Sequence, residues 1–226
     1  MSNLCIIPAR GGSKRIPRKN IKDFLGKPII AYSIETALQS DLFDEVMVST
    51  DDEEIAQVAK DFGACVPFFR SEKNSDDFAT TTDVLLEVID RYEILGINFD
   101  FVCCIYPTAP LVKIEKLRVG FQKIYKEDYN TVFPVVPFSY PVWRGLKIEN
   151  DKVKMLWPEN LNKRSQDLEE TYHDAGQWYW LNVKKFKKDS IIYSRNSSSV
   201  FLESTEVQDI DNLIDWKLAI LKYQNL

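Results

Sequence analysis

Short β-branched and aromatic runs alternate with segments of helical periodicity along the first 136 residues of this chain. A strand, a crossover helix and the next strand pack most readily as a parallel unit, so this alternation predicts an α/β fold with a mostly parallel sheet. The expected strands lie at 4–9, 45–50, 64–69, 101–106 and 131–136, and the expected helices at 27–40, 53–62, 82–95 and 113–126.

The pattern changes between residues 138 and 175. Residues 145–156 predict a β-hairpin with its turn at 149–151, and the polar stretch after it shows little periodicity. Such a segment buries little apolar surface by itself, so we expect it to pack on something else. The α/β body resumes with strands at 176–183 and 199–204 and a helix at 212–223, which divides the chain into a body, 1–137 and 176–226, and an insertion, 138–175.

Composition excludes several functional classes. The 226 residues are 45% hydrophobic, which is enough for one large α/β domain. A net charge of -5 argues against a general nucleic-acid or membrane-surface role, and the longest apolar run, 101–112, is too short to cross a bilayer. No secretory signal is recognisable, and the four cysteines lack C-x-x-C spacing. We therefore expect reduced core thiols in a cytoplasmic protein.

A basic loop with two glycines follows the first predicted strand. It contains neither G-x-x-x-x-G-K-[ST] nor G-x-G-x-x-G, which excludes P-loop NTPases and dinucleotide dehydrogenases. Gly11 and Gly12 carry no Cβ to hold phosphate oxygens away, and Ser13 adds a hydroxyl, so the loop suits a polyphosphate. A solvated basic surface loop is the alternative. The sequence PARGGSKRIPRKN (8–20) holds five cations: Arg10, Lys14, Arg15, Arg18 and Lys19.

Two aspartates near the carboxyl end are the best candidate metal ligands. A polyphosphate site normally needs a divalent cation held by oxygen ligands. In an extended segment Asp209 and Asp211 point to the same face, because side chains alternate with period two, and the pair can hold one Mg²⁺. The alternative is that Asp211 caps the last helix.

Two further stretches allow a functional and a structural interpretation. Arg70 and Thr81 belong to a polar segment, 70–84, which could contact a nucleobase or could cap the helix that begins near Thr82. His173 is the only histidine, so a zinc site is not expected. It could contact a sugar or be an ordinary loop residue.

Several stretches together resemble the acylneuraminate cytidylyltransferase family, which activates sialic-acid-like sugars with CTP. The resemblance covers the whole chain, and its motifs occur in the family's order. It implies a Rossmann-like nucleotidyltransferase fold with helices on both sheet faces, a Mg²⁺-dependent reaction, and a homodimer in which the insertion reaches across to the partner. The matching stretches are IPARGGSKRIPRKN (7–20), STDDEEIAQVAKDFGA (49–64), DDFATTTDV (76–84), YPTAPL (106–111) and DIDNLID (209–215).

The resemblance also implies roles for individual residues. The metal would be held by Asp209 and Asp211, and the catalytic charges would be supplied by Arg10, Lys19 and Asp211. The triphosphate and cytidine would be bound by Arg10, Gly11, Gly12, Ser13, Lys14, Lys19, Asn20, Arg70, Ala79 and Thr81. The sugar would be bound by Tyr106, His173, Gln177, Trp178 and Tyr179.

This sequence departs from the sialic acid enzymes at informative positions. Those enzymes tend to have glutamine before the P-T-[SA]-P block and arginine shortly after it, where this chain has Tyr106 and Val112. The string YHDAGQWYW (172–180) resembles the branch of the family that activates pseudaminic acid. A sugar with two acetamido groups and a terminal methyl presents more apolar surface than sialic acid, and aromatic walls suit it.

The expected reaction is attack of the anomeric hydroxyl of a nonulosonic acid on the α-phosphorus of CTP, which gives a CMP-sugar and pyrophosphate. Catalysis would consist of alignment and charge neutralisation, without a covalent intermediate. The base is left open between a metal-bound hydroxide, Asp209 and His173. Alternatives are the same reaction on sialic acid, legionaminic acid or Kdo, a non-catalytic CTP-binding regulatory module, and a structural interaction domain.

Overall fold

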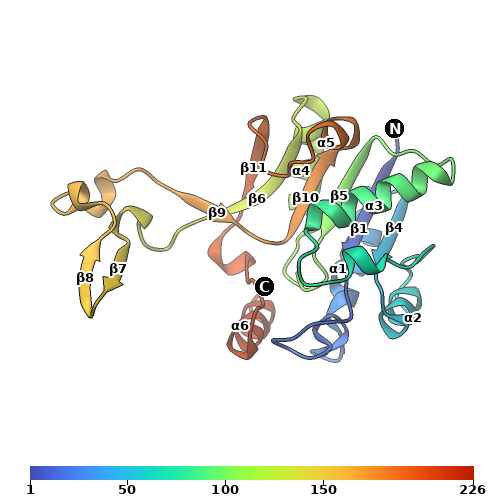
Figure 1. The fold of residues 1–226 in the computed structure, drawn as a ribbon, viewed down its shortest axis with the longest axis horizontal. Coiled ribbons are helices and arrows are strands. Elements are labelled where there is room, and N and C mark those ends of the chain that lie inside the picture. The colour runs from blue at the N-terminus through green and yellow to red at the C-terminus, as the bar shows by residue number, and fades with distance from the viewer.

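The computed structural model describes all of residues 1–226, and its centre is a seven-stranded, mainly parallel sheet (Figure 1). The strand order is β11-β6-β10-β5-β1-β4, with β9 paired to β6. Only β10 and β9 run against the other five. The strands are β1 (Asn3–Pro8), β4 (Glu45–Ser49), β5 (Phe101–Ile105), β6 (Thr131–Pro137), β9 (Tyr172–Asp174), β10 (Trp178–Asn182) and β11 (Ser197–Phe201).

Helices cover both faces of the sheet, as expected. One face packs on α1, α2 and α4, and the other packs mainly on α3 and α5. Alternation along β10 shows the division, because Trp178 and Trp180 enter the first core and Tyr179 and Leu181 the second. The helices are α1 (Ile29–Gln39), α2 (Glu53–Asp61), α3 (Thr81–Ile94), α4 (Ile114–Lys126), α5 (Val183–Asp189) and α6 (Leu213–Tyr223). None is long and apolar enough to span a membrane.

Two predictions about the body were wrong. Residues 64–69 form no strand; they make one isolated bridge, Met47 with Cys65, beside the edge strand β4. Pro67 lacks a backbone N–H, which disfavours continued pairing. Helix α5 was not predicted because its seven residues are too few to show a clear helical period. The cysteines are all free, as expected, and three of the four are buried.

Residues 138–171 leave the body as a projecting arm (Figure 1). The predicted hairpin is confirmed as β7 (Leu146–Glu149) and β8 (Lys152–Met155), with Asn150 and Asp151 at positive φ in the turn. Leu146 pairs with Met155 and Ile148 with Val153, so these apolar side chains share one hairpin face. The opposite face carries Lys147, Glu149, Lys152 and Lys154.

The carboxyl-terminal helix α6 returns to the basic loop that follows β1 (Figure 1). Ile16 from the loop and Ile210 from the segment before α6 are almost completely buried in the same cluster as Trp216. A short hairpin, β2 (Asp23–Phe24) with β3 (Lys27–Pro28), adds Phe24 to that cluster. Burial of apolar surface therefore brings two segments almost 200 residues apart into contact. Short 3₁₀ turns lie at Lys19–Ile21, Glu72–Asn74, Val142–Arg144, Pro158–Asn160, Ser165–Asp167 and Ser204–Glu206.

Candidate active site

A polar pocket of about 210 Å³ opens at the carboxyl ends of β1 and β5. In a parallel sheet this is the edge at which ligands bind. The basic loop forms most of its wall, and Tyr106, Pro107 and Thr108 after β5 form the rest. Most of the predicted triphosphate-binding side chains therefore face one cavity. From the loop, the lining residues are Arg10, Ser13, Lys14, Arg15, Ile16, Lys19 and Asn20.

The basic loop and the aspartate pair meet directly. Lys19 Nζ donates a 2.7 Å hydrogen bond to the carbonyl oxygen of Ile210, the residue between the two aspartates. Arg15 Nη1 lies 2.7 Å from Asp211 Oδ2. Ile210 is buried, so its side chain anchors the segment, and its neighbours Asp209 and Asp211 lie close enough to Lys19 for their charges to act on it. The basic loop and the segment that carries the two aspartates are therefore in contact in the folded chain.

Burial and charge oppose each other at this junction. Burial lowers the pKa of Lys19, and the carboxylates of Asp211 and Asp209 partly restore it. Burial raises the pKa of Asp209, with the Asp211 charge as the second cause and Lys19 as the main opposing charge. Because burial and a neighbouring carboxylate both disfavour the charge of Asp209, this position gains from a bound divalent cation.

The capping alternative for Asp211 is wrong. Asn212 is the N-cap of α6, and its side chain accepts from the backbone N–H groups of Ile214 and Asp215. The carboxylate of Asp215 completes a capping box. The Asp211 carboxylate therefore takes no part in the cap and pairs with Arg15.

Two cations of the loop are paired with a carboxylate that the sequence analysis did not assign. Arg10 Nη1 lies 2.9 Å from Asp77 Oδ1, and Lys14 contacts the other oxygen of Asp77. Lys14, followed by Arg10, lowers the pKa of Asp77. The only sequence signal for this contact is the acidic pair Asp76-Asp77 before the helix α3, which carries no information about its partner.

The two glycines of the loop have different roles. A Cβ on Gly11 would lie 2.7 Å from Asp52 Oδ2, and the Gly11 N–H already donates to Asp51. Gly11 therefore makes room for a carboxylate, which corrects the prediction that it makes room for phosphate. A Cβ on Gly12 would meet no atom within 4 Å, so only Gly12 leaves open space beside the pocket.

The predicted nucleoside contacts lie around the same edge of the sheet. Asn20 donates to the carbonyl oxygen of Arg10 and lines the pocket. Arg70 is held at the end of β4 by hydrogen bonds to Ser49, near Arg10. The N-cap of α3 is Thr80, which leaves the Thr81 hydroxyl to bond with the Tyr106 hydroxyl at 3.1 Å. Ala79 donates its N–H to Asp76 in the adjoining turn.

Two neighbouring cavities extend the site on the side where a sugar was expected. One, of about 350 Å³, shares Tyr106 with the basic pocket and is also lined by Thr81, Tyr179 and Tyr193. The other, of about 460 Å³, brings His173 and Asp209 onto one wall. Tyr106 and Tyr179 therefore line the cavity that adjoins the basic pocket, and His173 lines the second cavity.

Trp178 and Gln177 are corrections to the predicted sugar site. Trp178 is completely buried on the opposite sheet face, where its ring packs on Gly120 of α4. The Gln177 side chain is 3% exposed and donates to the carbonyl oxygen of Glu206. Alternation along β10 turns Tyr179 toward the cavity and Trp178 away from it, whereas Gln177 precedes the strand and is held by its bond to Glu206. The sequence string suggested an aromatic wall, but not which of its residues point inward.

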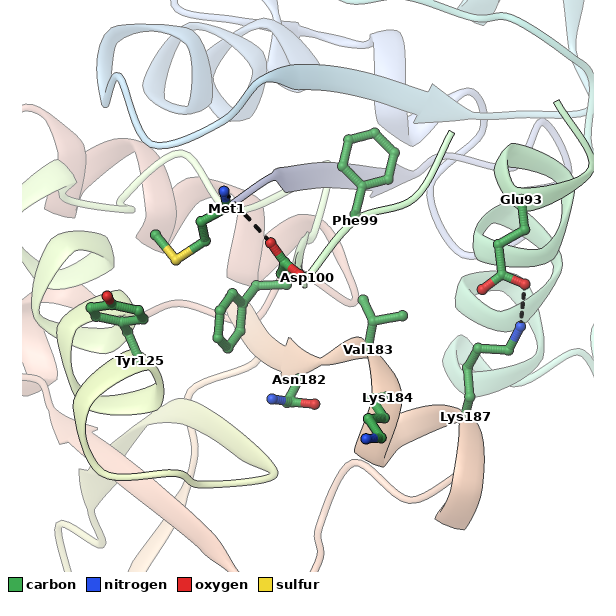
Figure 2. Close-up of a pocket in the computed structure, with 10 residues that line it drawn as sticks. Met1, Glu93, Phe99, Asp100, Tyr125, Asn182, Val183, Lys184 and Lys187 are labelled. Atoms are coloured by element: carbon green, nitrogen blue, oxygen red, sulfur yellow. Dashed lines mark hydrogen bonds and ion pairs between the residues drawn. The ribbon is translucent and has the colours of Figure 1, made fainter. Parts of the chain in front are cut away.

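A cavity of about 760 Å³, larger than the three described above, lies at the other end of the sheet (Figure 2). Met1, Phe99 and Asp100 line it, and these residues precede β1 and β5, whereas the basic loop follows β1. Lys187 approaches it but is paired with Glu93 and Asp90. It contains none of the predicted site residues, so size does not identify the active site here.

Comparison with known proteins agrees with the geometry at the carboxyl edge. The sequence model of the cytidylyltransferases matches residues 4–202, which is most of the chain. The chain belongs to the cytidylyltransferase family. A pseudaminic acid cytidylyltransferase of Campylobacter jejuni is 45% identical over 225 residues, with 99% of this chain and 97% of the relative covered. A CMP-N,N'-diacetyllegionaminic acid synthase of Legionella pneumophila is 36% identical, with 97% and 95% covered.

A solved structure shares the fold of this cytidylyltransferase family member. The CMP:2-keto-3-deoxy-manno-octonic acid synthetase complexed with CTP superimposes with a TM-score of 0.73 at 18% identity, and all of both chains is covered. At that identity the likeness concerns the fold alone. The predicted Rossmann-like nucleotidyltransferase fold is confirmed.

Proposed function

We propose that this protein transfers the CMP moiety of CTP to pseudaminic acid, giving CMP-pseudaminic acid and pyrophosphate. The anomeric hydroxyl oxygen forms a bond to the α-phosphorus, the bond from that phosphorus to the β-phosphate oxygen breaks, and the hydroxyl loses its proton. The relatives named pseudaminic acid cytidylyltransferases, 44–45% identical over 99% of the chain, support this sugar.

One observation carries the proposal: Lys19 and Arg15, which line the basic pocket, also contact the Asp209–Asp211 segment. Negative charge develops on the departing pyrophosphate, and preorganised cations beside it lower the barrier. Arg10, Lys14 and Lys19 come from one loop and line one pocket. The entropic cost of bringing these charges together is therefore met during folding and does not add to the reaction barrier.

The residues present fit Mg²⁺. Asp209 and Asp211 are hard oxygen donors, and no group of three or more His, Cys, Asp or Glu side chains forms a metal cage. Mg²⁺ characteristically takes one or two carboxylates and completes its shell with water and substrate phosphates. We propose that these two aspartates hold it, where it would neutralise phosphate charge. His173 and Asp209 line one cavity, which makes them the side-chain candidates for accepting the hydroxyl proton, beside a metal-bound hydroxide.

A pyrophosphate-release assay tests this function. CTP and Mg²⁺ would be supplied with pseudaminic, legionaminic or sialic acid, or with Kdo, and we expect the highest kcat/KM with pseudaminic acid. A preference for another acid would change the assigned sugar but keep the reaction. Binding of CTP without pyrophosphate release in any of the four mixtures would instead indicate a non-catalytic nucleotide-binding module.

We also propose that the arm joins two copies of this chain. The apolar hairpin face is open to solvent, with Leu146 60%, Ile148 73% and Val153 62% exposed. A two-stranded hairpin is marginal in water unless that face is covered. A second copy supplies an identical face, which is the simplest self-complementary partner.

The free cysteines suit a reducing compartment such as the cytoplasm.

A further inference from the structure

We infer that Asp174 and Tyr193 form a specificity device, in which Asp174 orients the Tyr193 hydroxyl to accept the N–H of an acetamido group on the sugar. This inference rests on the proposed function and adds to it the group that is recognised. Neither residue was identified as a site residue from the sequence. Both lie beside the cavity that Tyr106 shares with the basic pocket.

Asp174 is fixed from three directions. Its Oδ1 accepts from the backbone N–H of Gly176 at 3.1 Å, and its Oδ2 accepts from the hydroxyls of Tyr179 and, at 2.9 Å, Tyr193. Tyr179 is only 2% exposed, so its ring is fixed by the core. Tyr193 is 59% exposed and packs edge-on against Phe133. Both phenols line the cavity, and Tyr193 is the more accessible of the two to a ligand.

The hydrogen-bond direction determines what this phenol can bind. A carboxylate only accepts, so the protons of both phenols point toward Asp174. The Tyr193 oxygen then presents lone pairs to the cavity. A ligand N–H satisfies these lone pairs, whereas a carbonyl oxygen at the same place would face another acceptor.

The rest of the cavity suits the other parts of an acetamido group. Ile191 and Ile192 follow α5 on the same wall as Tyr193 and offer apolar surface for a methyl group. Thr82 and Ser190 also line the cavity, and a hydroxyl can donate to a carbonyl oxygen. The cavity thus offers an acceptor for the N–H, donors for the carbonyl oxygen and apolar surface for the methyl group of one acetamido group. We expect it to prefer sugars with an acetamido group over sugars that carry only hydroxyls.

The experiment measures binding without turnover. Calorimetry with protein saturated with CMP and Mg²⁺ would give Kd for pseudaminic acid, which carries two acetamido groups, and for Kdo, which carries none. We expect Tyr193→Phe to weaken pseudaminic acid binding about tenfold, the value of one hydrogen bond, and to change Kdo binding less than about twofold. Asp174→Asn should act in the same direction, because an amide N–H turns the Tyr193 proton toward the cavity.

Two control variants separate this role from general destabilisation. Tyr125→Phe and Asp41→Asn make the same chemical changes at exposed positions that do not line the cavity and should leave both Kd values unchanged. Equal losses for both acids, no loss, or a wild-type protein that binds neither acid would overturn the inference. Binding of pseudaminic acid without pyrophosphate release from CTP would reject the proposed function and leave the inference standing.

Discussion

The Nζ atom of Lys19 lies 2.7 Å from the carbonyl oxygen of Ile210, and this contact joins the first loop of the chain to its last segment. Lys19 therefore reaches both the predicted triphosphate pocket and the predicted metal ligands.

Lys19→Ala should lower kcat about 10²-fold, because it removes a preorganised charge that acts on the developing pyrophosphate. Steady-state pyrophosphate release measures this effect. Lys184→Ala, which removes a lysine at the opposite end of the sheet, is the matched control and should retain wild-type kcat. Unchanged turnover in Lys19→Ala would place Lys19 outside the catalytic machinery.

Asp209→Asn should stabilise the chain in the absence of nucleotide and metal. Burial and Asp211 raise the pKa of Asp209 above 3.8, so this carboxyl contributes stability at low pH that is lost as the pH rises through its folded-state pKa. Asparagine cannot ionise. We expect a higher Tm than wild type at neutral pH and a difference that shrinks below pH 3.8.

The same variant should lose the gain in Tm that wild type shows on addition of Mg²⁺ and CTP, because ligands stabilise the state that binds them. Asp189→Asn, at an exposed position, serves as the control for both measurements. An Asp209→Asn protein that is less stable than wild type at neutral pH would contradict the assigned cause of the pKa shift.

Asp77→Asn should strengthen CTP binding. Asp77 pairs with Arg10 and Lys14, and a triphosphate must displace it to reach these cations. The pairs are solvent-exposed and therefore weak, so the decrease in Kd should not exceed about fivefold. Titration of CTP at two salt concentrations measures it, and Asp90→Asn, which removes one of the two carboxylates paired with Lys187, is the control. Weaker binding would show that Asp77 orients the cations rather than competing for them.

Gly12→Ala and Gly120→Ala should have opposite effects. A Cβ at position 12 meets nothing in the folded chain, so Tm should stay at or slightly above wild type while CTP binding weakens. A Cβ at position 120 would lie 2.5 Å from the Trp178 ring, which should cost about 1–3 kcal/mol of unfolding free energy by overpacking. Thermal unfolding and CTP titration of both variants would check this; a Gly12→Ala protein with unchanged CTP affinity would move the phosphates away from Gly12.

Ile148→Lys should convert a dimer into a monomer. It places a charge in the apolar hairpin face that we propose a second copy covers. Light scattering coupled to gel filtration measures the mass, and Lys147→Ala, on the charged face of the same strand, should stay dimeric. A wild-type protein that is monomeric at micromolar concentration would reject the dimer.

Much of the fold could be predicted from local pattern. The helices α1 to α4 and the strands β1, β4, β5 and β6 have a clear period and lie within a few residues of their expected positions. The strand predicted at residues 64–69 was wrong because an apolar run has the same sequence pattern whether or not it pairs with the neighbouring edge strand. The antiparallel direction of β10 could not be predicted from the local sequence either, because side chains alternate with period two in parallel and antiparallel strands alike.

The sequence by itself determined the chemistry of the site, because a basic loop after a buried strand and two aspartates at spacing two are visible in the letters. Only the tertiary structure decided which residues share it. Burial of Ile16 and Ile210 in one cluster places Lys19 against the aspartate segment, and the alternation of β10 turns Tyr179 inward and Trp178 away. These outcomes depend on contacts between segments that are distant in the sequence. Burial of apolar surface is non-directional, so these contacts follow from the packing of the whole chain and cannot be read from one stretch alone.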